Sequence, residues 1–198
     1  MPVLVSPVVP DGRLSARPQP TLRVDELVMR PWLLSDVDAV VAAYDDAEIQ
    51  RWHVRTMNRD EALAWLASWP DRWRSETGAG WAVTQDGVLV GRVGLRSIGL
   101  HEGTAEIAYW TIPAARGRNI ATRATRAVST WMFHHGGFHR IELRHSTANT
   151  HSCRVAEKAG FGYEATIRQG VLHLDGWHDM HLHARLASDR ALPSLDRS

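Results

Sequence analysis

The segment with the clearest chemical content is a short loop that joins a strand-like stretch to a helix-like stretch. Residues 105–112 have the composition of a strand, Pro113 ends them, and a helix is predicted from about residue 119 to 135. A tight loop entering a helix leaves backbone N–H groups unpaired, and the helix dipole adds positive potential. This pattern favours anion binding, although an ordinary connection with solvated arginines remains open. The loop residues are Arg116, Gly117, Arg118, Asn119, Ile120, Ala121 and Thr122.

Histidine and cysteine residues raise the question of metal chemistry. The chain has eleven histidines and one cysteine, Cys153, so an internal disulfide is excluded. His181 and His183 alternate on one strand face together with Asp179. No His-x-x-x-His helix pair and no cysteine partner accompany them, so the sequence predicts a wetted strand face and no metal site.

These residues must be positioned by an alternating series of strands and helices. The periodicity predicts helices at about 35–44, 60–74, 119–135 and 150–159, with Pro70 expected to kink or end the second. An Asp86-Gly87 turn between alternating apolar residues is the strongest hairpin signal. We therefore expect one α/β domain with a mixed sheet of about six to seven strands and about four helices. Residues 1–20 and 188–198 are expected to be tails around a domain at 21–187.

Tryptophan is concentrated in one part of the chain. Five of the nine tryptophans fall between Trp52 and Trp81. Large rigid aromatic side chains fill cores, and they also wall substrate clefts. The sequence leaves both interpretations open.

Composition limits the partners of the protein. Its 198 residues carry a formal net charge of +1, which gives little attraction for nucleic acid, although several arginines cluster near residue 118. No stretch reaches the roughly 18 apolar residues of a membrane span, and the apolar start lacks the pattern of a signal peptide. We expect a cytoplasmic protein with no membrane partner and disfavour a nucleic-acid partner.

Several ordered motifs resemble one family. Residues 116–121 are similar to the cofactor loop Gln/Arg-x-x-Gly-x-Gly/Ala of the GNAT superfamily of acyl-CoA-dependent N-acyltransferases, with Asn119 in place of a glycine. Residues 106–110 resemble the fourth strand of that family. Residues 149–161 resemble the Asn-x-x-Ser segment of its Rim-type branch, which acetylates ribosomal-protein N-termini. Asparagine tolerates positive φ and caps helices well, so the loop conformation is expected to survive.

The resemblance implies a cofactor, acetyl-CoA or another acyl-CoA, and a place for it. The strands at 105–112 and 140–145 would be parallel and splay apart, with pantetheine in the gap and pyrophosphate on the loop amides. The acyl thioester would then lie beside Trp110, Thr111 and Ile112, and the backbone N–H of Ile112 would hold the developing oxyanion.

Catalytic roles also follow from the resemblance. Glu106 is the carboxylate expected to accept the amine proton through water, unless its role is structural. Ser152 would protonate the leaving thiolate, with Tyr109 and Tyr163 as alternative donors, although Ser152 could instead be a helix cap. Asn149 would bind the pantetheine amide or serve as a turn residue.

The sequence therefore predicts an N-acetyltransferase that transfers an acyl group directly to a primary amine, either a protein N-terminus or a small amine. A covalent route through Cys153 is disfavoured, because direct transfer needs no enzyme nucleophile. A different acyl donor such as succinyl-CoA, or a CoA-binding module without turnover, is the alternative. A homodimer is left open.

Overall fold

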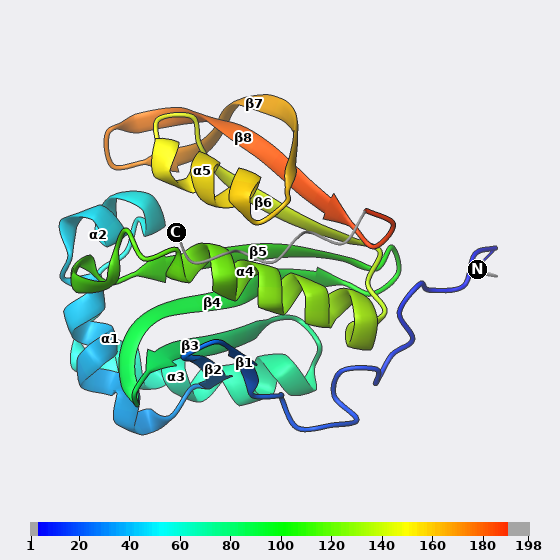
Figure 1. Ribbon diagram of the computed structural model, residues 1–198, viewed down its shortest axis with the longest axis horizontal. Helices are drawn as coiled ribbons and strands as arrows, with labels where there is room; N and C mark the ends of the chain where they lie inside the picture. The colour runs from blue at the N-terminus through cyan, green and yellow to red at the C-terminus, as the bar shows by residue number, and fades with distance from the viewer. Residues whose placement is uncertain (1–3, 190–198) are drawn as a thin grey trace.

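The computed structural model describes residues 4–189 and contains one eight-stranded mixed sheet in the order β1-β2-β3-β4-β5-β6-β8-β7 (Figure 1). All neighbouring strands are antiparallel except β5 and β6. The strands are β1 (Leu22–Val24), β2 (Leu27–Pro31), β3 (Ala79–Gln85), β4 (Val88–Gly99), β5 (Thr104–Thr111), β6 (Arg140–Ser146), β7 (Gly162–His173) and β8 (Gly176–Leu186).

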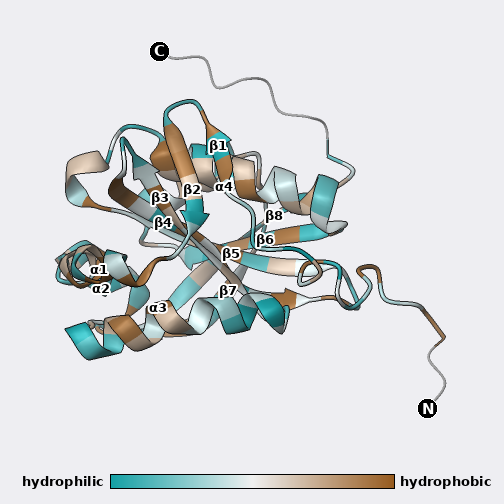
Figure 2. Cartoon of the chain, turned by 90° about the horizontal axis from the view of Figure 1, so that it is seen from below, coloured by the Kyte–Doolittle hydropathy of each residue, from teal (hydrophilic) through white to brown (hydrophobic). Residues whose placement is uncertain are grey.

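Helices cover both faces of this sheet. Figure 2 shows α4 on one side of the strands and α1, α2 and α3 on the other. The described residues form five α-helices and eight strands, one helix and one or two strands more than the sequence predicted. The helices are α1 (Val37–Tyr44), α2 (Ala47–His53), α3 (Arg59–Arg74), α4 (Ile120–Trp131) and α5 (Thr150–Lys158).

Two hydrophobic clusters hold the layers together. The cluster on the α4 side includes Val128 and Ile107, and the cluster on the α1–α3 side includes Leu66, Trp69 and Trp110. All five side chains are at most 4% exposed, so they contribute the apolar burial that stabilises a mixed α/β domain. Both faces of the sheet are thus covered by packed apolar side chains.

Several local signals in the sequence agree with the observed elements. The β3–β4 hairpin turns at Asp86 and Gly87, which both have positive φ, as an Asp-Gly turn of this type requires. Helix α3 ends at Arg74 as predicted and contains Pro70, so this proline does not end the helix. Helix α2 was missed, although Asp46 accepts a hydrogen bond from the N–H of Ile49 and so caps its first turn.

Residues 8–20 pack on the domain where the sequence predicted a tail. Val9 and Leu14 are buried in the α4-side cluster. The carboxylate of Glu76 accepts hydrogen bonds from the N–H groups of Gly12, Leu14 and Ser15 at 2.6–3.0 Å. The segment has no regular strand or helix, so its sequence has no periodic pattern that predicts packing. Its backbone N–H groups instead bond to the Glu76 carboxylate and to single carbonyls of the domain. The predicted C-terminal tail lies mostly outside the described residues.

The parallel strands β5 and β6 separate after a short paired stretch. They pair only from Thr104 to Ile107 in β5 and from Arg140 to Leu143 in β6, and both strands continue beyond this point. The splay implied by the family resemblance is therefore confirmed. A splayed pair leaves backbone groups without a ladder partner, so something other than a strand must satisfy them.

Candidate active site

Two cavities meet where β5 and β6 separate. The loop cavity, of about 650 Å³, is lined by residues 115–117 and 119–122, the end of β5, helix α2 and helix α5. The arginine cavity, of about 420 Å³, lies on the other side, against α3, β4 and β7. Five residues line both cavities: Trp52, His53, Tyr109, Asn149 and Ser152.

The predicted anion-binding loop has the expected backbone conformation. Gly117 and Asn119 have φ of 78° and 53°, so Asn119 does adopt the left-handed conformation that the family assigns to glycine. Its side chain does not cap α4; its Oδ1 instead accepts a hydrogen bond from Lys158 Nζ at 3.3 Å. Within the described chain, no acceptor is found for the N–H groups of residues 117–122. Successive unpaired amides at a helix start form an anion site.

The loop arginines are held by partners on neighbouring elements. Arg116 pairs with Asp46 at the start of α2, and Arg118 donates to the side chain of Gln85. Arg123 forms an ion pair with Glu26 at 2.9 Å. Of these three, only Arg116 lines the loop cavity, so the structure does not bring Arg118 to the cavity wall.

The predicted oxyanion donor is wrong. The N–H of Ile112 donates to the carbonyl of Val90 at 3.1 Å, which extends the β4–β5 ladder past the end of β5. Backbone groups in a strand alternate between its two neighbours, so those of Tyr109 and Thr111 face the gap. Their carbonyls accept from His53 and Arg116 across it. The amides of Tyr109 and Thr111 are therefore the available donors, and Ile112 does not line the cavity.

Tyr109 and His53 form the wall between the cavities. His53 Nε2 donates to the Tyr109 carbonyl at 3.1 Å, so its Nδ1 carries the lone pair. Burial, with the nearby Arg92 charge adding to it, lowers the pKa of His53 to about 3, so the ring is neutral at pH 7. Burial also raises the pKa of Tyr109, and its phenol stays protonated. Sequence reasoning missed His53 because it missed α2.

The start of α5 brings Asn149 and Ser152 to the same point. Asn149 Oδ1 accepts from the N–H of Ser152 at 3.0 Å, so Asn149 is the helix cap and Ser152 is not. The Tyr109 hydroxyl lies 3.5 Å from the Ser152 carbonyl oxygen. Asn149 is 8% exposed and its side-chain amide nitrogen remains available to a ligand carbonyl. Tyr163, the other predicted donor, lines neither cavity and is exposed.

The predicted base Glu106 lies outside both cavities. Its carboxylate pairs with Arg96 at 3.3 Å, and Arg96 itself lines the arginine cavity. Glu106 lies on the same face of β5 as Ala108 and Trp110. Ala108 lines the arginine cavity, whereas Glu106, two residues before it, does not. Its catalytic role stays a prediction without a direct path to the meeting point.

The arginine cavity is lined by five arginines, of which Arg96 and Arg144 are paired with Glu106 and Glu142. Among the described residues, none with a carboxylate lines it. Arg92 is 7% exposed, its Nε is buried without a hydrogen-bond partner, and its guanidinium lies 5.4 Å from the Trp65 ring and 5.2 Å from the Trp69 ring. These tryptophans belong to the core and also wall a cavity, so both interpretations of the cluster apply. The cavity arginines are Arg55, Arg72, Arg92, Arg96 and Arg144.

Cys153 is not placed for covalent catalysis. It lines neither cavity, and burial together with Glu157 raises the pKa of its thiol. The structure does overturn one premise of the sequence analysis, because Cys153 lies beside His145, His181 and His183. The histidines thus have a cysteine neighbour that spacing along the chain concealed.

Known proteins are similar to this chain in sequence. A family model described as an acetyltransferase (GNAT) domain matches residues 26–162. The N-acetyltransferase YoaA of Bacillus subtilis, whose name marks it as uncharacterized, is 25% identical over 154 residues, covering 76% of this chain and 87% of that protein.

Within the described residues no helix is long and apolar enough to cross a membrane.

Solved structures show the same fold. RimJ of Mycobacterium smegmatis, in complex with CoA-disulfide, has a TM-score of 0.76 and 24% identity over 85% of this chain and 86% of that one. An acetyl transferase of Salmonella typhimurium that modifies the N-terminal serine of a 50S ribosomal subunit protein has a TM-score of 0.78 and 19% identity over 84% of this chain and 99% of that one. Since the family model covers more than half of the sequence, the chain belongs to the GNAT family of acetyltransferases.

Proposed function

We propose that this acyltransferase moves an acetyl group from acetyl-CoA directly to a primary amine, and that the preferred acceptor carries a negative charge near that amine. The N-terminus of an acidic peptide is such an acceptor. The observation that carries the proposal is the meeting of an anion-binding loop cavity with a cationic cavity at Tyr109. Each cavity suits one of the two substrates.

The loop cavity suits the CoA donor. The unpaired amides of residues 117–122 and the positive end of α4 match a pyrophosphate, and Arg154 and Lys158 add charge at the wall. Asn149 is available to a pantetheine amide. The thioester would then reach the gap beside Trp110 and Thr111.

Transfer at the meeting point requires three steps that these residues can support. The neutral amine attacks the thioester carbonyl, and the N–H of Thr111 or Tyr109 stabilises the oxyanion. The C–S bond breaks as the carbonyl re-forms, and the leaving thiolate takes a proton from Tyr109 or Ser152. The nitrogen of the new amide loses its extra proton to solvent, from which the donating hydroxyl is reprotonated. The products are an amide and free CoA.

The amine must be neutral before it attacks, and its environment favours this. Model amines have pKa values of about 8 for an N-terminus and about 10 for lysine. Arg55, Arg72 and Arg92 line this cavity and have no ion-pair partner among the described residues, so their charge destabilises an ammonium and lowers the pKa of a bound amine. This effect reduces the need for the general base that Glu106 was expected to provide.

The same charges select the acceptor. Arg92 is buried without an ion-pair partner among the described residues, a costly arrangement unless a ligand anion completes it. Arg55, Arg72 and Arg96 add like charge around it. A carboxylate or phosphate on the acceptor would relieve this repulsion.

The test measures release of free CoA thiol with acetyl-CoA and two peptides. One peptide has a free N-terminus followed by Asp and Glu residues; its control has Asn and Gln at those positions. We expect acetylation of the N-terminus, with kcat/KM at least about tenfold higher for the acidic peptide, or about 1.4 kcal/mol. A thermal-shift panel of acyl-CoAs reports the donor preference. Absence of thiol release with every amine would remove the transferase proposal, and equal rates would remove only the acceptor preference.

A further inference from the structure

Four side chains with metal-binding atoms gather on the α5 side of the sheet. His145 lies on β6, His181 and His183 lie on β8, and Cys153 lies on α5. One potential ligand atom from each lies within 4.8 Å of those of the other three. Only His145 reaches the wall of a cavity, so the cluster is separate from the meeting point of the two cavities.

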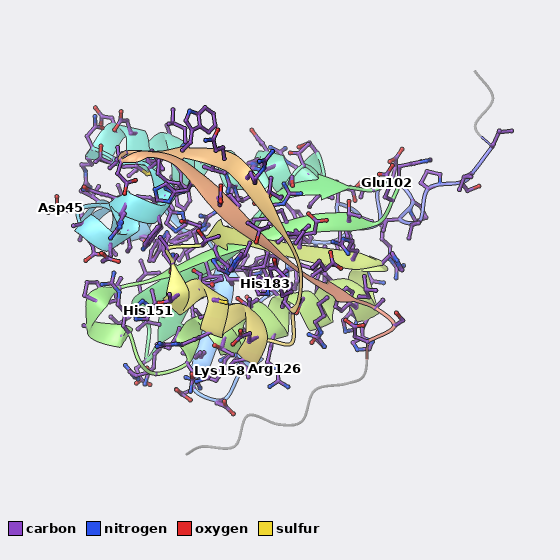
Figure 3. The ribbon with its side chains drawn as sticks, turned by 90° about the horizontal axis from the view of Figure 1, so that it is seen from above. Asp45, Glu102, Arg126, His151, Lys158 and His183 are labelled. Atoms are coloured by element: carbon purple, nitrogen blue, oxygen red, sulfur yellow. The ribbon has the colours of Figure 1, made fainter. Side chains whose placement is uncertain are left out.

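Strand pairing and helix packing create the cluster. His145 is directly opposite His181 in the β6–β8 ladder, and His183 follows two residues later on the same face. Helix α5 covers this face and presents Cys153 to it. Figure 3 shows His183 in the interior beside α5, the helix that carries His151 and Lys158.

The hydrogen bonds of two histidines leave their lone pairs facing each other. His145 Nδ1 donates to the Ser146 carbonyl at 2.8 Å, and His183 Nδ1 donates to the Phe161 carbonyl at 3.4 Å. A carbonyl oxygen only accepts, so each Nε2 of a neutral ring carries a lone pair. These two Nε2 atoms lie 3.3 Å apart, and the rings are 5% and 1% exposed. Two acceptors at this distance repel unless a cation lies against both.

The ligand atoms of the other two members have few partners or none among the described residues. The Nδ1 of His181 is buried without a hydrogen-bond partner. Among the described residues, the Cys153 thiol has Glu157 as its one hydrogen-bond partner, at 3.6 Å and one turn along the same helix. A proton shared between His145 and His183 would satisfy one contact and leave His181 orphaned. A metal ion would satisfy all four side chains.

We propose that His145, Cys153, His181 and His183 form a four-coordinate site for a divalent metal, with Zn²⁺ as the ion that this ligand set fits best. Zinc takes imidazole and thiolate ligands in tetrahedral geometry, with Zn–N of about 2.0–2.1 Å. Neighbouring nitrogens in such a tetrahedron are about 3.3 Å apart, the separation of the two Nε2 atoms here. The carbonyl acceptors at both Nδ1 atoms are the supports that metal-bound histidines require.

The site would be structural, because four protein ligands leave no open position for a substrate. Binding would release the thiol proton of Cys153, leaving one thiolate and three neutral imidazoles around the ion. It would tie α5 to β6 and β8. Since Asn149 and Ser152 lie at the start of α5, the metal would hold part of the transferase site in place.

The experiment uses the full chain without a polyhistidine tag, grown with zinc and dialysed against metal-free buffer. We expect about one zinc per chain by elemental analysis, and a lower Tm after a chelator removes it. Cobalt added to the metal-free protein should give the intense d–d bands of a tetrahedral site and a thiolate-to-cobalt charge-transfer band. Zinc should also protect Cys153 from alkylation.

Two variants and a control decide the assignment. Cys153→Ser removes the thiolate with little change in shape and should weaken zinc binding at least about a hundredfold. His183→Ala should do the same, and His101→Ala, an exposed histidine outside the cluster, should bind as the wild type does. If His183→Ala does not fold, the comparison of Cys153→Ser with wild type is sufficient. Zinc retained equally by Cys153→Ser and wild type, or no zinc bound by wild type at micromolar concentration, would overturn the proposal.

Discussion

At the scale of single residues, two hydroxyl groups compete for one proton transfer where the cavities meet. Ser152 is free of the capping role, which Asn149 performs, and Tyr109 is protonated because burial raises its pKa. Either could donate to the leaving thiolate. Tyr109 lies near the end of β5 and lines both the loop cavity and the arginine cavity.

Replacing these hydroxyls separately identifies the donor. The true donor's variant, Tyr109→Phe or Ser152→Ala, should lose about 10² to 10⁴ in kcat with CoA affinity nearly intact. The other variant should change kcat less than about threefold. Steady-state rates and calorimetric CoA affinities on both variants, with Tyr163→Phe as the matched control, decide between them. If neither variant slows turnover, solvent supplies the proton.

Replacing Arg92 should weaken acceptor binding without lowering the stability of the fold. Arg92→Met removes a buried charge without a protein partner, so the free energy of unfolding should stay equal or rise. The KM for an acidic acceptor should rise at least about tenfold, because the ligand anion loses its partner. Urea unfolding and acceptor kinetics measure the two quantities. Arg59→Met, an exposed arginine on α3 paired with Asp38, is the control and should leave KM unchanged. A destabilised variant with normal KM would mean that Arg92 is structural.

At the scale of elements, the cofactor loop depends on its backbone conformation more than on the side chain of Asn119. Asn119 has φ of 53°, and glycine adopts this conformation without strain. Asn119→Gly should therefore keep CoA affinity within about threefold, whereas Asn119→Val should weaken it at least about tenfold, because a β-branched residue is strained there. Isothermal calorimetry with CoA checks both. A large loss in Asn119→Gly would instead assign a binding role to the contact with Lys158.

The neutral His53 in helix α2 should make the free energy of unfolding fall in mild acid. His53 has a pKa of about 3 in the folded protein and an ordinary value of 6.5 when exposed. Below pH 6.5 the unfolded chain therefore binds a proton that the folded chain does not, and the free energy of unfolding falls as pH falls toward 3. Between pH 7 and pH 5.5 this group contributes a loss of about 1 kcal/mol.

The variant His53→Gln keeps a donor for the Tyr109 carbonyl and has no titration. Urea unfolding at pH 7 and pH 5.5 measures the free energy of unfolding of both proteins. The decrease between the two pH values should be about 1 kcal/mol smaller in the variant than in the wild type. Other buried histidines contribute equally to both proteins and cancel in the comparison. Identical pH dependence in the two proteins would show that His53 is not neutral and buried in solution.

At the scale of the whole molecule, two cavities with a shared wall leave room for both substrates at once, as the proposed direct transfer needs. Double-reciprocal plots at varied donor and acceptor concentrations should intersect, as direct attack predicts. Mass spectrometry after incubation with acetyl-CoA alone should find no acetylated cysteine, since Cys153 lines neither cavity. Parallel lines with a trapped acyl-cysteine would contradict direct transfer.

The sequence by itself determined the features that depend on neighbouring residues. Strand alternation, the Asp86-Gly87 turn and the unpaired amides at the start of α4 all follow from local backbone chemistry, and the structure contains each of them. The left-handed conformation of Asn119 belongs to the same class. The family motifs added the splay of β5 and β6, which is confirmed.

Tertiary structure alone decided which groups meet across long stretches of chain. The N–H of Ile112 pairs with Val90 because the β4–β5 register, which no local pattern encodes, continues past the strand. Arg92 faces a cavity without a counter-charge because α3 packs tryptophans against it. Cys153 reaches His183, thirty residues away, because α5 lies over the β6–β8 ladder. Spacing along a chain cannot reveal such contacts, since they arise from strand register and helix packing.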